Sequence, residues 1–183
     1  IRDRDKGFDV LLLTEDVDEF CLQILHSYPR KDAEGKDGTV EFKNVNSGDL
    51  GLESEEEKKA AEDATAENKA LFDAMKDALN GKVKEVKVST RLKSHPVCLT
   101  SGEGMTFEME KYFAAVQPDL ALKAKRILEV NVEHPAFAAL ESARITDPDR
   151  AKKYAEILLN QAMLIAGLPL ENPSDYTDLV CSL

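Results

Sequence analysis

The end of the chain contains two apolar helical patterns in succession, and each of them begins with a proline. Asp147 is placed to cap the first helix with Pro148 at its first position, and Asn172 and Pro173 repeat this arrangement. Proline is tolerated there because the N–H that it lacks has no partner inside the helix. Residues 167–169, Gly-Leu-Pro, form a stop signal between the two patterns. The sequence therefore predicts a helical hairpin.

This hairpin carries more apolar surface than one neighbouring helix can cover. Apolar residues between Tyr154 and Ile165 spread over more than one narrow stripe, which indicates contacts on two sides. The second helix has an apolar face at positions i, i+3, i+4 and i+7. Either both helices pack on their own domain, as helical hairpins usually do, or two copies of the hairpin pair about a two-fold axis as a four-helix arrangement.

Composition argues against several classes of function. No segment has the ~18 consecutive apolar residues of a membrane helix, so we expect a soluble protein of the cytoplasm that does not bind membranes. The net charge of −11, without a basic cluster, argues against nucleic-acid binding. The three cysteines are far apart and are interpreted as reduced thiols. The chain starts without Met or a signal peptide, which favours a fragment of a longer protein.

Residues 1–53 have the pattern of the end of an α/β unit. An apolar run predicts a strand at residues 8–13, and apolar residues at helical spacing predict a helix directly after it. Residues 29–52 contain glycines typical of loops, and these surround a short predicted strand at residues 39–45.

Residues 54–183 have the pattern of a complete α+β domain. Ser54 and Glu57 fit a capping box, and the helix that follows is expected to be solvated in its first half and docked in its second, ending at Asn80 and Gly81. The elements expected next are strands at residues 83–88, 97–100 and 125–132, and helices at residues 105–116, from residue 134, and in the terminal hairpin. The helices thus gather towards the C-terminal end of the chain.

No recognisable catalytic or cofactor-binding pattern is present in the sequence. His26, His95 and His134 are far apart and have no partner at metal-ligand spacing. Residues 101–104, Ser-Gly-Glu-Gly, lack the lysine and spacing of a phosphate-binding loop, so they favour a flexible loop. There is no nucleophile elbow. We therefore expect neither a metal, nor a cofactor, nor an enzymatic activity in this chain.

One predicted helix has an unusual apolar face of methionine and aromatic residues. The residues of this face are Met105, Met109, Tyr112, Phe113 and Val116. On periodicity alone, the pattern favours an ordinary helix that packs against the core. Methionine, however, has little shape preference and suits a surface that accepts several apolar partners.

Three segments, in this order, resemble the Hsp90 chaperones, and most closely their bacterial members. Residues 7–20, GFDVLLL with DVDEF, are similar to a segment late in the family's middle domain. Residues 84–92, KEVKVSTRL, with Pro96 and the stretch from Met105 to Phe113, are similar to the start of its C-terminal domain. Residues 158–173, LLNQAMLIAG followed by LENP, are similar to its terminal hairpin, and this match is the most specific.

The resemblance implies an architecture and an activity. Residues 1–53 would be the C-terminal end of the middle domain, and residues 54–183 the dimerisation domain, whose hairpin forms a four-helix bundle with its mate. The whole protein would be an ATP-driven chaperone whose ATP and Mg²⁺ site lies in an N-terminal domain outside this chain. The chain ends without the Met-Glu-Glu-Val-Asp tail that recruits TPR co-chaperones in eukaryotic members.

The resemblance also implies roles for particular residues. Client proteins would contact the methionine and aromatic face together with Phe20 and Gln23, although bacterial members commonly have Trp at the position of Phe20. The dimer interface would consist of Tyr154, Ile157, Leu158, Gln161, Leu164, Ile165, Tyr176, Leu179, Val180 and Leu183. The alternative is a plain homodimerisation or adaptor module with one fixed protein partner.

Overall fold

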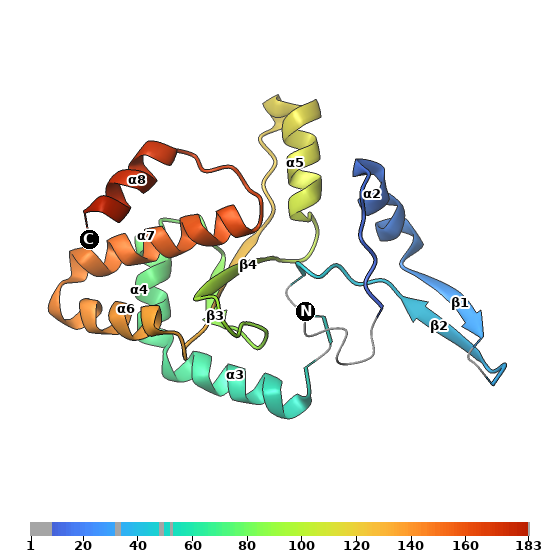
Figure 1. The fold of residues 1–183 in the computed structure, drawn as a ribbon, viewed down its shortest axis with the longest axis horizontal. Coiled ribbons are helices and arrows are strands. Elements are labelled where there is room, and N and C mark those ends of the chain that lie inside the picture. The colour runs from blue at the N-terminus through green and yellow to red at the C-terminus, as the bar shows by residue number, and fades with distance from the viewer. Residues whose placement is uncertain (1–8, 32–33, 48–49, 52, 183) are drawn as a thin grey trace.

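The structure is a computed structural model that describes residues 9–31, 34–47, 50–51 and 53–182 (Figure 1). Its first part consists of helix α2 (Asp16–Leu25) and the antiparallel pair β1 (Ser27–Lys31) and β2 (Asp37–Glu41). Helix α2 begins with a capping box between Glu15 and Asp18, which confirms the helix predicted there.

Two expectations for this first part are wrong. Of the strand predicted at residues 8–13, residue 8 lies outside the described residues, residues 9–13 form no strand, and Leu11, Leu12 and Leu13 are exposed. No described strand lies beside them, and a strand without a neighbour has no partner for its backbone groups. The predicted strand at residues 39–45 is shifted, because β2 runs from Asp37 to Glu41 and pairs with β1, which the pattern did not predict.

A mixed three-stranded sheet forms the centre of the second part. Strand β5 (Arg126–Val130) lies between β3 (Glu85–Val88), to which it is parallel, and β4 (Val97–Ser101), to which it is antiparallel. All three strands are predicted from the sequence, but β3 and β4, which follow each other in the chain, are not neighbours. The parallel pairing of β3 and β5 requires a long crossover, which here includes β4 and α5 (Phe107–Val116).

Helices lie beside the sheet (Figure 1), and the buried apolar side chains of the strands and of these helices form one hydrophobic core. Helices α4 (Lys69–Ala78) and α7 (Pro148–Ile165) contact the strands, and α6 (Pro135–Thr146) packs on α7. Because side chains alternate along a strand, the buried Leu128 and Val130 point to this core, while Glu129 points to the other face. The mixture of helices and small sheets agrees with the α+β class.

Helices α3 (Glu55–Glu67) and α4 confirm the interpretation of the charged segment after residue 53. The amide of Glu57 donates to Ser54 Oγ over 3.1 Å, and the amide of Ser54 donates to Glu57 Oε2 over 2.9 Å. Helix α3 has no buried residue, whereas α4 buries three apolar residues, so the first half is solvated and the second half is docked. The helical run ends at Asn80 and Gly81, both with positive φ.

The terminal hairpin is present as α7 and α8 (Pro173–Cys181). Asp147 Oδ1 accepts from the amide of Arg150, and Asn172 Oδ1 accepts from the amide of Ser174, each over 3.1 Å. Helix α7 buries six residues in its own chain, whereas no residue of α8 is buried. Among the described residues, no helix is both long enough and apolar enough to cross a lipid bilayer.

Candidate functional site

Helix α5 projects from the sheet and lies beside α2 (Figure 1). Thr106 caps its first turn, because the amide of Met109 donates to Thr106 Oγ1 over 3.2 Å. Phe107, the first helical residue, is fully buried in the core. At the opposite end of the helix Val116 is 56% exposed. The helix is therefore fixed at its base and open at its tip.

A buried ion pair fixes the same base from the sheet side. Glu110 and Arg126 form this pair, and the second carboxylate oxygen of Glu110 accepts from the amide of Ala124 over 2.8 Å. Both side chains of the pair are about nine-tenths buried. The apolar periodicity gave no sign of this contact, since glutamate in an amphipathic helix normally indicates the solvated face.

The helix begins two residues later than predicted, and this changes the position of Met105. Met105 precedes the N-cap, is half-buried and packs against the hydrophobic core, so it does not share a helical face with the other four residues of the predicted stripe. Met109, Tyr112, Phe113 and Val116 do lie on the helix.

Residues from α2 and α5 meet in what we call the α2/α5 cluster, which consists of Phe20, Gln23, Met109, Tyr112 and Phe113. The ring centroid of Phe20 lies 5.2 Å from that of Tyr112 and 6.1 Å from that of Phe113, both in edge-to-face geometry. Gln23 Nε2 donates to Met109 Sδ over 3.1 Å. Edge-to-face pairs contribute about 0.5–1.5 kcal/mol beyond their buried area, so these rings help to hold α2 on α5.

The α2/α5 cluster is neither core nor open surface. Tyr112 is 37% exposed, and the other four members are half-buried. The core-facing residues of α5 are instead Phe107 and Glu110. Helix α5 thus has one face against the sheet and another against α2 and solvent. The first face agrees with the hypothesis of a helix that packs against the core, and the second is partly exposed, as the hypothesis of a binding surface requires.

The hairpin residues predicted for a dimer interface divide into two groups. Ile157 and Leu158 are buried within their own chain, which leaves them little surface for a second copy. Leu164, Ile165 and Val180 are exposed at the surface. The half-buried residues are Tyr154, Gln161, Tyr176 and Leu179, and Leu183 lies outside the described residues.

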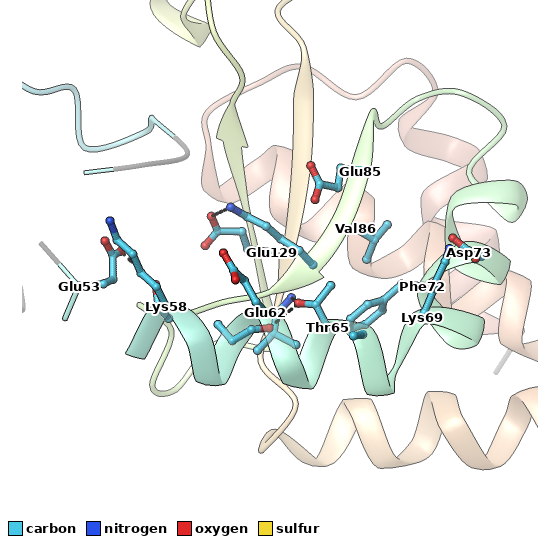
Figure 2. A pocket seen from close by; sticks show the side chains of 15 residues that line it. Glu53, Lys58, Glu62, Thr65, Lys69, Phe72, Asp73, Glu85, Val86 and Glu129 are labelled. Carbon is cyan, nitrogen blue, oxygen red and sulfur yellow. Dashed lines mark hydrogen bonds and ion pairs between the residues drawn. The ribbon is translucent and has the colours of Figure 1, made fainter. Parts of the chain in front are cut away.

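An open cavity of about 580 Å³ lies between α3 and β3 (Figure 2). Its lining carries charges of both signs, and several are already paired, such as Lys69 with Asp73 and Lys87 with Glu129. The described residues contain no group of three His, Cys, Asp or Glu side chains that could hold a metal ion. The paired charges of the lining are therefore engaged with one another.

Cys98 is expected to be the least reactive of the three thiols. Burial, and then the nearby Glu129 carboxylate, raise the pKa of Cys98 to about 12, whereas Cys21 and Cys181 are exposed. Because the thiolate is the nucleophile, alkylation of Cys98 at pH 8 should be at least ~10-fold slower than that of the other two. Time-resolved iodoacetamide labelling with peptide mass spectrometry measures this, and equal rates in the folded chain would contradict it. In urea the three rates should converge.

Comparisons with known proteins identify relatives over nearly the whole chain. The family model described as "Hsp90 protein" matches residues 2–183. "Chaperone protein HtpG" of Clostridium perfringens (strain 13 / Type A) is 46% identical over 179 residues. The proteins of the same name from Clostridium acetobutylicum and Halalkalibacterium halodurans are each 45% identical, over 180 and 179 residues. Each match covers 98% of this chain.

The matched region is a limited part of these relatives. The chain spans 27% of the length of each of the three HtpG proteins. Family membership does not depend on the rest of their length, because the family model covers this chain almost completely. The chain therefore belongs to the Hsp90 family.

Proposed function

We propose that this chain is part of an ATP-dependent molecular chaperone, in which the α2/α5 cluster binds partly folded client proteins and the α7/α8 hairpin joins two copies. The observation that carries the proposal is the half-exposed cluster of methionine and aromatic side chains, which two distant segments build together. The HtpG relatives, which are named as chaperones, support the same function.

The chemistry of the α2/α5 cluster suits loose binding of varied apolar segments. Met109 has an unbranched, flexible side chain, and the rings of Phe20, Tyr112 and Phe113 supply large apolar area. Val116 at the tip of α5 and Leu120 further along the chain are exposed as well. Phe107 and the Glu110 ion pair hold the base of α5, so a rigid helix presents adaptable side chains.

A dimer would place two such surfaces in one particle. Once one surface has bound a client, the second contact becomes intramolecular, which raises its effective concentration. We place residues 1–53 in the middle domain and residues 54–183 in the dimerisation domain. ATP and Mg²⁺ would be bound by a part of the longer protein outside this chain, which is consistent with the 27% of each relative's length that the chain spans.

Tyr112→Ser combined with Val116→Ser should weaken client binding about tenfold, which corresponds to a loss of about 1.4 kcal/mol. Both positions are exposed, so the fold should persist, whereas Met105 packs against the core and is less suitable for such a test. The measurement is the concentration of chain that suppresses aggregation of a chemically unfolded substrate by half. Thermal unfolding and sedimentation of each variant check its fold and association.

The matched control is Ile145→Ser, which removes an apolar side chain that is 72% exposed at the end of α6. It should leave suppression unchanged. Equal suppression by the double variant and the unsubstituted chain would exclude the α2/α5 cluster as the client surface. Saturable binding to one folded protein, without an effect on unfolded substrates, would instead support the adaptor module.

A further inference from the structure

Glu129 is a buried carboxylate at the centre of the sheet. It lies on the middle strand β5, its side chain is 2% exposed, and it points away from the apolar core. A buried charge is costly unless it is paired and hydrogen-bonded. The polar partners of this carboxylate are therefore important for the structure around it.

The partners of Glu129 come from both neighbouring strands and from the turn after β3. Ser89 Oγ donates to Oε2 over 2.9 Å, and Thr100 Oγ1 donates to Oε1 over 3.3 Å. Lys87 Nζ lies 3.7 Å from Oε1, and Arg91 Nε lies 3.3 Å from Oε2. Figure 2 shows Glu129 at the edge of the cavity beside α3. The carboxylate thus contacts two cationic side chains and two hydroxyl groups.

The same contacts fix the turn formed by residues 89–92. Ser89 Oγ, which donates to Glu129, also accepts from the amides of Arg91 and Leu92 over 3.2 and 3.3 Å. The backbone of the turn and the Arg91 side chain are therefore both oriented towards Glu129. Without the carboxylate charge, the Arg91 guanidinium would lose its ion-pair partner, and the Ser89 hydroxyl would donate to a neutral oxygen instead of a charged one.

This turn is in contact with the segment that follows β2. Arg91 Nη1 donates to the carbonyl of Val45 over 3.1 Å, and Thr90 Oγ1 donates to Glu53 Oε1 over 3.0 Å. One residue before Val45, Asn44 Nδ2 donates over 2.9 Å to Glu19 Oε1 of α2. A continuous series of polar contacts thus runs from the central strand to helix α2.

We propose that Glu129 is a positioning residue for the α2/α5 cluster: through Arg91 and the segment after β2 it holds α2 against α5. Removal of its charge loosens the contact of Phe20 with Tyr112 and Phe113, while the sheet and α5 stay folded. Binding of unfolded proteins by the cluster is not needed for this inference, so the two can fail separately.

A tryptophan at position 20 provides the test, because the chain contains no tryptophan. In Phe20→Trp, fluorescence excited beyond the absorption of the four tyrosines comes from the single tryptophan and reports on the α2/α5 cluster. Adding Glu129→Gln should move the emission maximum to longer wavelength and raise the acrylamide quenching constant at least about twofold, since local opening exposes the indole. Both are measured well below the melting temperature, in the chain of 183 residues.

The matched control is Val130→Ala in the same Phe20→Trp chain. Val130 follows Glu129 on β5, is 1% exposed and points to the core, so truncation of its side chain lowers global stability but keeps the backbone carbonyl that accepts from the amide of Ser89. It should leave emission and quenching unchanged. Arg91→Met, which leaves Lys87 on Glu129, should reproduce the effect of Glu129→Gln, and it carries the test if Glu129→Gln does not fold. An unchanged tryptophan in Arg91→Met, or equal changes in Val130→Ala, would overturn the inference.

Discussion

Phe107→Ala should lower the free energy of unfolding by about 3–5 kcal/mol, the range for a fully buried phenylalanine. Phe107 is 0% exposed and begins α5, so its ring is the apolar anchor of the projecting helix. Truncation leaves a cavity that the sheet and surrounding helices cannot fill without moving. Urea denaturation followed by circular dichroism measures the loss, at one fixed protein concentration because association would add to the apparent stability.

Phe113→Ala is the matched comparison, because it makes the same chemical change on the other side of the same helix. Phe113 is half-buried and belongs to the α2/α5 cluster, so its truncation should cost only about 1–2 kcal/mol. The difference between the two losses of unfolding free energy compares the contact of α5 with the core and its contact with α2. Similar losses for both would contradict the assignment of Phe107 as the anchor.

The start of α5 shows what periodicity misses. An apolar face identifies a buried side only when a helix has one such side, and α5 has two, one against the core and one against α2. The pattern therefore grouped Met105 with Met109 and overlooked Phe107. A capping signal was available: Thr106 is a favourable N-cap residue and places the first helical residue at Phe107.

The strands show a second limit of the local pattern. Apolar residues at residues 83–88, 97–100 and 125–132 predicted β3, β4 and β5, but their order in the sheet depends on tertiary packing across a long crossover. The run at residues 8–13 has the same composition as a buried strand, but composition does not determine whether a second strand is available to pair with it. Strand β1 contains Pro29 and charged residues, so no pattern indicated it.

The α2/α5 cluster could not be derived from spacing at all. Gln23 and Met109 are 86 residues apart, and nothing in either segment specifies the other. Only the family resemblance grouped Phe20 and Gln23 with the residues of α5. The structure brings five of the seven residues proposed for client binding into one cluster, while Met105 packs against the core and Val116 lies beyond the cluster at the tip of α5.

Leu164→Asp combined with Ile165→Asp should weaken self-association by a factor of at least about 100, which is about 2.7 kcal/mol. In one chain both residues are exposed, by 51% and 57%, at the end of a helix that buries six other residues in its own chain. In the proposed four-helix arrangement they would be buried, and two carboxylates without partners there would cost several kcal/mol. Sedimentation equilibrium at tens of micromolar measures the loss as a shift from dimer to monomer.

Val17→Asp combined with Ile24→Asp is the matched control, since both residues are exposed on α2 and receive the same added charge. This variant should remain dimeric. Ile157→Ala separates the role of α7 in the core from its role in association. Because Ile157 is buried within its own chain, this substitution should lower thermal stability more than it lowers association. An unsubstituted chain that sediments as a monomer at tens of micromolar would contradict the hairpin interface. Exposed apolar residues on α7 and α8 would then need a covering partner other than a second copy.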